Sequence, residues 1–146
     1  MARLMQRIIV ATDGSPDANR AVDVAARLAK STGANLTIMT VGGQISGAEL
    51  RRLASRDGDL SEAMISAANK ILKQAQKRAV RIGVAAPKLR CGWGDAGETI
   101  MEAVRSEKAD ILVVGRRGRG RLTGLLLGSV SQKLASLAPC IVMVVP

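Results

Sequence analysis

Short apolar runs alternate along this chain with longer segments in which apolar residues recur every three or four positions. A short apolar run is typical of a buried strand, and the longer spacing is typical of a helix with one buried face. Their alternation favours βαβ units, in which helices cover both faces of a parallel sheet. Five strands are expected, at residues 7–12, 35–41, 88–91, 110–115 and 140–145.

Four helices are expected between these strands. The first begins at Pro16 and Asp17, because proline suits a first helical turn, and it ends at Gly33. We find no internal repeat, so residues 1–146 are predicted to form a single α/β domain with three layers. The other three helices are expected around residues 60–79, 100–104 and 129–137.

The residue inventory excludes several kinds of chemistry. The chain has no histidine, which removes Ser-His-Asp and Cys-His nucleophile pairs and H-E-x-x-H zinc sites. Trp93 is the single aromatic residue, so no platform exists on which successive bases stack. No Gly-Lys pair occurs, which excludes a P-loop. We therefore predict a binding protein with no catalytic residue and no metal ligands of its own.

Cysteine usage and apolar stretches predict the compartment. Cys91 and Cys140 are too few to staple a secreted scaffold, and both are expected to be free thiols. The first residues lack the apolar run of a signal peptide. The longest apolar stretch, residues 138–146, is less than half of a membrane span. The expectation is a cytoplasmic protein that does not enter membranes.

Unusual loops follow the first and fourth expected strands. Ligands of parallel sheets bind beyond the carboxyl ends of the strands, where these loops lie. Residues 13–15 read Asp-Gly-Ser, and residues 115–129 hold five glycines before a helix start at Ser129. Glycines allow close backbone approach, and a helix start offers unpaired N–H groups, so the second loop has the parts of a phosphate cradle. A solvated surface loop with an ordinary serine cap is the alternative.

Basic residues offer a different interpretation of the same loop. The net charge is +10, and four of the arginines are Arg116, Arg117, Arg119 and Arg121. These charges suit either phosphate binding or non-specific contact with nucleic acid. Helix-turn-helix, zinc and RNP signatures are absent, so nucleic-acid binding stands as an alternative only.

A second glycine motif lies at Gly92, Gly94 and Gly97, with the spacing G-x-G-x-x-G. An NADP-type dinucleotide site is one interpretation, but it requires an acidic residue about 20 positions later. Arg116 and Arg117 stand there instead. A tight strand-to-helix turn with Asp95 near the helix cap is the favoured interpretation.

Several segments of the chain together resemble one known family. Gly115, Gly118, Gly128 and Ser129 fit the spacing G-x2-G-x9-G-[ST]. The segments RIIVATDGS, LTIMTV, GSVS and APCIVMVVP occur in the order found in universal stress proteins of the UspA-like, nucleotide-binding subgroup. The resemblance covers the whole chain. It implies an adenine nucleotide alpha hydrolase-like fold, with a five-stranded sheet in the order 3-2-1-4-5, and bound ATP.

The resemblance also implies a role for individual residues. Asp13 would contact the ribose and adenine, Thr12 would flank it, and the backbone of Val41 would line the adenine pocket. Thr40 and Arg117 stand where many relatives have histidine. The remaining cofactor-binding residues, around the phosphates, would be Gly115, Arg116, Gly118, Gly128, Ser129, Val130 and Ser131.

Function and assembly follow as expectations from the same resemblance. The protein is expected to act as an ATP-dependent regulatory binding protein in stress response, with Mg²⁺ carried on the phosphates and at most slow hydrolysis. In the implied strand order the last strand is an edge, and its uncharged apolar sequence invites pairing. We therefore predict a homodimer through Ile141–Val145. At the other edge, Lys88 and Arg90 are typical of a strand protected from pairing.

Overall fold

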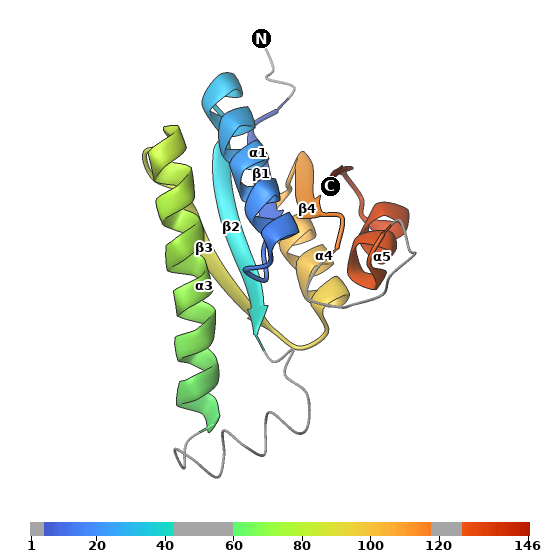
Figure 1. Ribbon diagram of the computed structural model, residues 1–146. Coiled ribbons are helices and arrows are strands. Elements are labelled where there is room, and N and C mark those ends of the chain that lie inside the picture. The colour runs from blue at the N-terminus through green and yellow to red at the C-terminus, as the bar shows by residue number, and fades with distance from the viewer. Residues whose placement is uncertain (1–4, 43–59, 118–126) are drawn as a thin grey trace.

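The computed structural model describes residues 5–42, 60–117 and 127–146 (Figure 1). These residues form one sheet of five parallel strands in the order β3-β2-β1-β4-β5. The predicted α/β class and strand order are therefore confirmed. In chain order the elements are β1 (Arg7–Ala11), α1 (Pro16–Thr32), β2 (Asn35–Gly42), α3 (Leu60–Ile82), β3 (Lys88–Trp93), α4 (Ala96–Glu107), β4 (Ile111–Gly115), α5 (Ser129–Leu137) and β5 (Ile141–Val145).

Helices cover both faces of the sheet, which gives the predicted three layers. Alternate side chains of β1 point to opposite faces, as in any strand. Ile8 and Val10 pack in a core with α1 and α3. Ile9 packs on the opposite side, with Ile100 of α4 and Leu134 of α5. Aliphatic side chains fill both cores, as the lack of aromatic residues requires.

The first helix begins and ends where its sequence predicts. Ser15 caps the helix, since its side chain accepts a hydrogen bond from the N–H of Ala18, and Pro16 occupies the first turn. Gly33 ends it in the left-handed conformation, with φ 75°. The buried face is rich in alanine, so α1 lies close to the sheet. The capped start of α1 directly follows the end of β1.

The third strand is longer than its sequence predicts. It continues through Gly92 and Trp93, which pair with Val41 and Gly42 of β2. Glycine usually indicates the end of a strand, but β3 continues past Gly92. On the neighbouring strand β2, the missing side chain of Gly42 makes room for the ring of Trp93. A Cβ at Gly42 would lie 2.3 Å from the ring of Trp93. The turn thus begins at Gly94, whose φ is 110°.

The edge position predicted for β3 is confirmed, but its arginine does not point freely to solvent. Arg90 Nη1 lies 2.7 Å from Glu107 Oε2 on α4, and Lys88 Nζ lies 3.7 Å from Glu107 Oε1. Thr37 of β2 donates a hydrogen bond of 2.8 Å to the same carboxylate. These contacts tie the beginnings of β2 and β3 to the end of α4.

Two smaller predictions concern the thiols and the membrane. Cys91 and Cys140 are both free cysteines, as expected. Among the helices in the described parts of the chain, none combines the length and apolar character needed to cross a membrane.

Candidate functional site

A cleft of about 370 Å³ opens at the carboxyl ends of β1, β2 and β4. Its walls come from the loop after β1, the segment after β4 and the first turns of α1, α4 and α5. β1 and β4 are sequence-distant neighbours at the centre of the sheet, where the strand order reverses. This is the position at which parallel α/β sheets bind ligands.

The loop after β1 is held by its own polar side chains. The N–H of Thr12 donates to the carbonyl of Met39 at 2.9 Å, which ties the loop to β2. Thr12 Oγ1 accepts from the N–H of Gly14 at 3.1 Å, and Asp13 Oδ1 accepts from the N–H of Ser15 at 2.9 Å. Gly14 adopts the left-handed φ of 79° that this turn requires. The turn thereby places the Asp13 carboxylate on the cleft wall.

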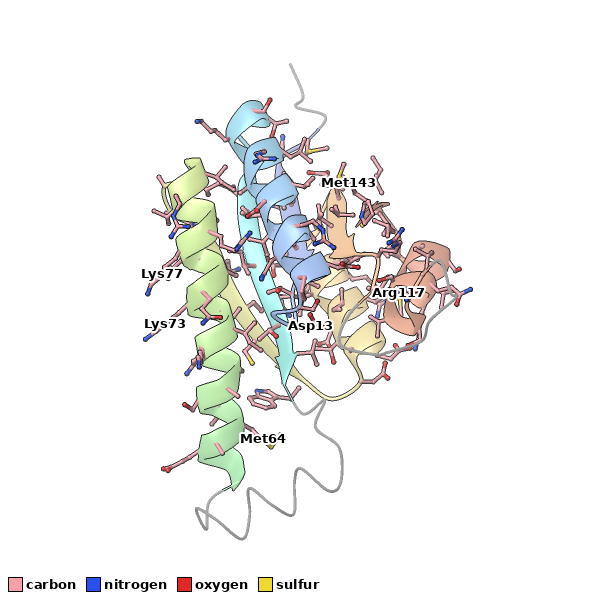
Figure 2. The ribbon with its side chains drawn as sticks, viewed as in Figure 1. Asp13, Met64, Lys73, Lys77, Arg117 and Met143 are labelled. Atoms are coloured by element: carbon pink, nitrogen blue, oxygen red, sulfur yellow. The ribbon has the colours of Figure 1, made fainter. Side chains whose placement is uncertain are left out.

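Gly115 brings the end of β4 against the start of α1. A Cβ at this position would lie 2.8 Å from the carbonyl carbon of Asp17 and 2.9 Å from the nitrogen of Ala18. Both atoms are backbone, so a side chain at 115 would have to push the two elements apart. Just beyond, the N–H of Arg117 donates to Asp17 Oδ2 at 3.2 Å. Figure 2 shows Asp13 and Arg117 at the same end of the sheet.

The start of α5 faces the cleft without a side-chain cap. Its N-cap is Gly128, which makes no side-chain hydrogen bond, whereas Ser15 and Asp95 cap α1 and α4. The first N–H groups of a helix have no partners within it and carry partial positive charge. Gly128, Ser129 and Val130 of this turn line the cleft. The turn is therefore suited to an anion.

Backbone and hydroxyl contacts position this helix start. The N–H of Gly128 donates to the carbonyl of Arg116 at 2.8 Å, and the N–H of Arg116 donates to the carbonyl of Val145 at 2.6 Å. Ser131, which is buried, donates its hydroxyl proton to the carbonyl of Gly115 at 2.6 Å. That hydroxyl holds α5 against β4, so its proton is engaged within the protein.

Most of the predicted site residues that the structure describes come together here. Arg116 is the exception: it is exposed and does not line the cleft, whereas Arg117 does. Gly118, Arg119 and Arg121 lie outside the described residues. The predicted residues that line the cleft are Thr12, Asp13, Val41, Gly115, Gly128, Ser129, Val130 and Ser131.

Other lining residues were not among the predicted site residues. Apart from Arg117, they are small or apolar, and for all of these but Leu127 a helical or strand pattern explains the residue without a ligand. The beginning of α4 contributes Ala96 and Ile100 because α4 packs beside α5. The spacing within α4 gives no sign of this neighbour. The small or apolar residues are Ala11, Ala18, Thr40, Ala96, Ile100, Val114 and Leu127.

The second glycine motif forms a turn, as favoured from the sequence. Asp95 caps α4, since its Oδ2 accepts from the N–H of Glu98 at 2.9 Å. This hydrogen bond is the main cause that lowers the pKa of Asp95, so the cap is negatively charged at neutral pH. A carboxylate already occupies the helix start at which a dinucleotide pyrophosphate would bind. The geometry therefore does not favour the dinucleotide interpretation.

Metal ligands do not gather in the described ranges: no three Cys, Asp or Glu side chains there lie close enough to hold an ion. The charged residues that line the cleft within these ranges are Asp13 and Arg117. The described walls thus offer backbone N–H groups, hydroxyls, one carboxylate and one guanidinium.

Residues 5–146 match the universal stress protein family in a comparison with known families. The chain belongs to the universal stress protein family. Universal stress protein YxiE of Bacillus subtilis (strain 168) is 29% identical in an alignment of 158 positions. The alignment covers 97% of this chain and 99% of that protein. The sequence match over the whole domain agrees with the strand order and the position of the cleft.

Solved structures of universal stress proteins share the fold. One, a complex with cAMP, is 33% identical with a TM-score of 0.75, over 98% of both chains. UspA from Lactobacillus plantarum is 25% identical with a TM-score of 0.81, over 100% of both chains. This universal stress protein therefore has the architecture of structures of which at least one holds an adenine nucleotide.

Proposed function

We propose that this universal stress protein binds ATP in the cleft. The observation that carries the proposal is the start of α5, which has no side-chain cap and faces a cavity of about 370 Å³. Small-molecule sites have volumes of about 300–1,000 Å³. The similar protein solved with cAMP supports an adenine nucleotide as the ligand class.

The residues of the walls indicate where each part of the nucleotide binds. Asp13 accepts hydrogen bonds from ribose hydroxyls, and Thr12 and Val41 flank the adenosine part. The triphosphate lies at the first turn of α5, where N–H groups and the hydroxyl of Ser129 donate to its oxygens. Mg²⁺ comes with the phosphates as the usual counter-ion of ATP, and Asp13 is the carboxylate among the described lining residues.

Binding without fast turnover follows from the same residues. The chain has no histidine, and Asp13 is the single carboxylate among the described lining residues. A general base must reach the attacking water, and Asp13 is engaged in its own turn. We propose a cytoplasmic regulatory protein whose surface changes with ATP occupancy, with hydrolysis slow at most.

Identification of the co-purified ligand tests this proposal. With one Trp and no Tyr, the protein absorbs weakly in the ultraviolet, so a bound adenine is visible near 260 nm. We expect mass spectrometry of the released ligand, or calorimetric titration of nucleotide-free protein with Mg-ATP, to show about one nucleotide per chain. The absence of both co-purified ligand and saturable binding would exclude ATP as the ligand.

A second copy of the chain is the proposed partner. β5 forms an edge of the sheet, and Ile141 at its start is 63% exposed. An unprotected apolar edge strand pairs readily with another strand. We propose a symmetric homodimer in which β5 meets the same strand of a second protomer.

A further inference from the structure

Lys133 of α5 joins two acidic residues at the start of α4. Its Nζ lies 3.0 Å from Glu98 Oε1 and 3.6 Å from Asp95 Oδ2. Hydrogen bonding to Glu98 is the main cause that raises the pKa of Lys133, so the lysine stays charged. The link spans two helices whose first turns both line the cleft.

The second glycine motif makes this link possible. A Cβ at Gly97 would lie 2.9 Å from Cδ of Lys133, so the lysine stem crosses the helix where a side chain is missing. Gly92 leaves similar room for Thr99, whose Cγ2 would lie 2.3 Å from an added Cβ. The glycines of this motif thus allow the first turn of α4 to pack closely against β3 and α5. This packing accounts for the motif without a dinucleotide.

The position of the acidic pair matters for an anionic ligand. Ala96, between Asp95 and Gly97, lines the cleft, as do the first residues of α5. Asp95 and Glu98 do not themselves line the cleft, and their side chains are 64% and 61% exposed, but they lie next to Ala96 in the first turn of α4. Carboxylates near a bound polyphosphate repel it, and the repulsion grows with every phosphate added. A lysine that contacts both carboxylates removes part of that repulsion.

We propose that Lys133 is a positioning residue that sets the preference of the cleft for highly charged nucleotides by offsetting part of the negative charge of Asp95 and Glu98. This inference rests on the proposed nucleotide binding. It concerns the number of phosphates on the ligand, because adenosine carries no charge and does not sense the acidic pair.

The test is a ligand series measured without Mg²⁺: adenosine, AMP, ADP and ATP, titrated calorimetrically into wild type and Lys133→Gln. We expect the loss of affinity to grow along the series, from under twofold for adenosine to about three- to tenfold for ATP, and to shrink in high salt. Lys133→Arg should restore the wild-type values because it keeps the charge. An equal loss for all four ligands would mean that Lys133 only holds the helices together, and would overturn the proposal.

Lys77→Gln is the matched control, since it removes the same charge from α3. Figure 2 shows Lys77 projecting from the outer side of α3, away from Arg117. Its effect on ATP affinity should be under about twofold. A loss as large as that of Lys133→Gln would assign the effect to net charge and overturn the proposal.

Glu98→Gln provides an independent test if Lys133→Gln does not fold. It removes one negative charge beside the cleft, so ATP affinity should rise about two- to threefold with adenosine affinity unchanged. Unchanged ATP affinity would contradict the proposal. If wild type binds none of the four ligands, the proposed function itself fails. That result differs from the case in which wild type binds them and the variants lose affinity equally for all four, which overturns only the role of Lys133.

Discussion

At the scale of single residues, position 115 requires glycine because the backbone of α1 leaves no room for a side chain. The φ angle of Gly115 is not positive, so its own conformation does not require glycine. The distances from an added Cβ to Asp17 and Ala18 are too short for any side chain. We expect Gly115→Ala to lower the free energy of unfolding by about 1–3 kcal/mol, because two backbone segments must separate. Urea denaturation followed by Trp93 fluorescence or circular dichroism measures this change.

Gly128→Ala serves as its control. Gly128 has φ −68° and ψ 163°, an extended conformation that alanine adopts without strain. Because Gly128 is the N-cap of α5, where glycine is preferred over alanine, the stability of this variant should fall by no more than about 1 kcal/mol. Equal stability of Gly115→Ala and wild type would show that the close approach of β4 and α1 is not needed.

Asp13 has two roles that substitutions can separate. Its Oδ1 accepts the N–H of Ser15, which an asparagine oxygen can also do, whereas its charge serves the proposed ligand. We expect Asp13→Ala to weaken Mg-ATP binding at least about tenfold, since a hydrogen bond to a charged group contributes about 1.5–3 kcal/mol. Asp13→Asn should lose less because the turn is kept.

Calorimetric titration measures both Asp13 variants. Asp23→Asn is the control: Asp23 lies on α1 and binds Arg78 of α3 at 2.7 Å, and it does not line the cleft. Its ATP affinity should equal that of wild type. Unaltered binding by Asp13→Ala would remove Asp13 from the site.

At the scale of elements, Glu107 connects α4 to the beginnings of β2 and β3. Its side chain is 14% exposed, and its carboxylate accepts hydrogen bonds from Arg90 at 2.7 Å and from Thr37 at 2.8 Å. Burial is the largest single influence and raises the pKa of Glu107, but the hydrogen bonds from Arg90 and Thr37 and the charges of Lys88 and Arg90 together lower it below its ordinary 4.5. The ionised carboxylate therefore stabilises the fold.

The sign of this pKa shift predicts a pH dependence. A carboxyl group with a lowered pKa in the folded state stabilises it above about pH 4.5, and the contribution is lost as the pH falls through the folded pKa. We expect Glu107→Gln to be about 1–2 kcal/mol less stable than wild type at pH 7, with the difference shrinking below pH 4.5. Urea denaturation at pH 7 and in acid measures it.

Glu102→Gln is the matched control on the same helix, because Glu102 is exposed. It should match wild type within about 0.5 kcal/mol at both pH values. A Glu107→Gln deficit that persists unchanged in acid would show that the side chain acts through packing and not through its charge.

At the scale of the whole molecule, the two edges of the sheet differ in a way that predicts assembly. β3 carries Lys88 and Arg90, whereas β5 carries no charge. Met143 lies at the centre of β5 (Figure 2). We expect Met143→Lys to shift the proposed dimer to monomer in analytical ultracentrifugation, because a charge disfavours pairing of an edge strand.

Two further variants make the assembly result interpretable. Ile141→Lys should have the same effect at a more exposed position, which avoids the core that Met143 contacts. Val80→Lys makes the same kind of change on α3, where Val80 is 50% exposed, and should leave the dimer intact. A dimer that survives both β5 variants would exclude this interface.

The sequence by itself determined the elements and their order along the chain. Ser15, Pro16 and Gly33 bound α1 through local backbone preferences and hydrogen bonds, and these act over a few residues wherever the helix lies. Apolar runs of period two and segments of period 3.6 likewise identify strands and helices from neighbours in sequence. The glycine and serine pattern at residues 115–129 indicated a phosphate cradle for the same local reason.

The tertiary structure alone decided which side chains meet. Arg117 and not Arg116 faces the cleft, Ala96 and Ile100 join its wall, and Lys133 crosses Gly97. Each of these depends on how whole helices pack against the sheet, which is set by the fit of many side chains distant in sequence. A glycine motif looks the same in sequence whether it approaches a ligand or a lysine, and only the packed neighbour distinguishes the two.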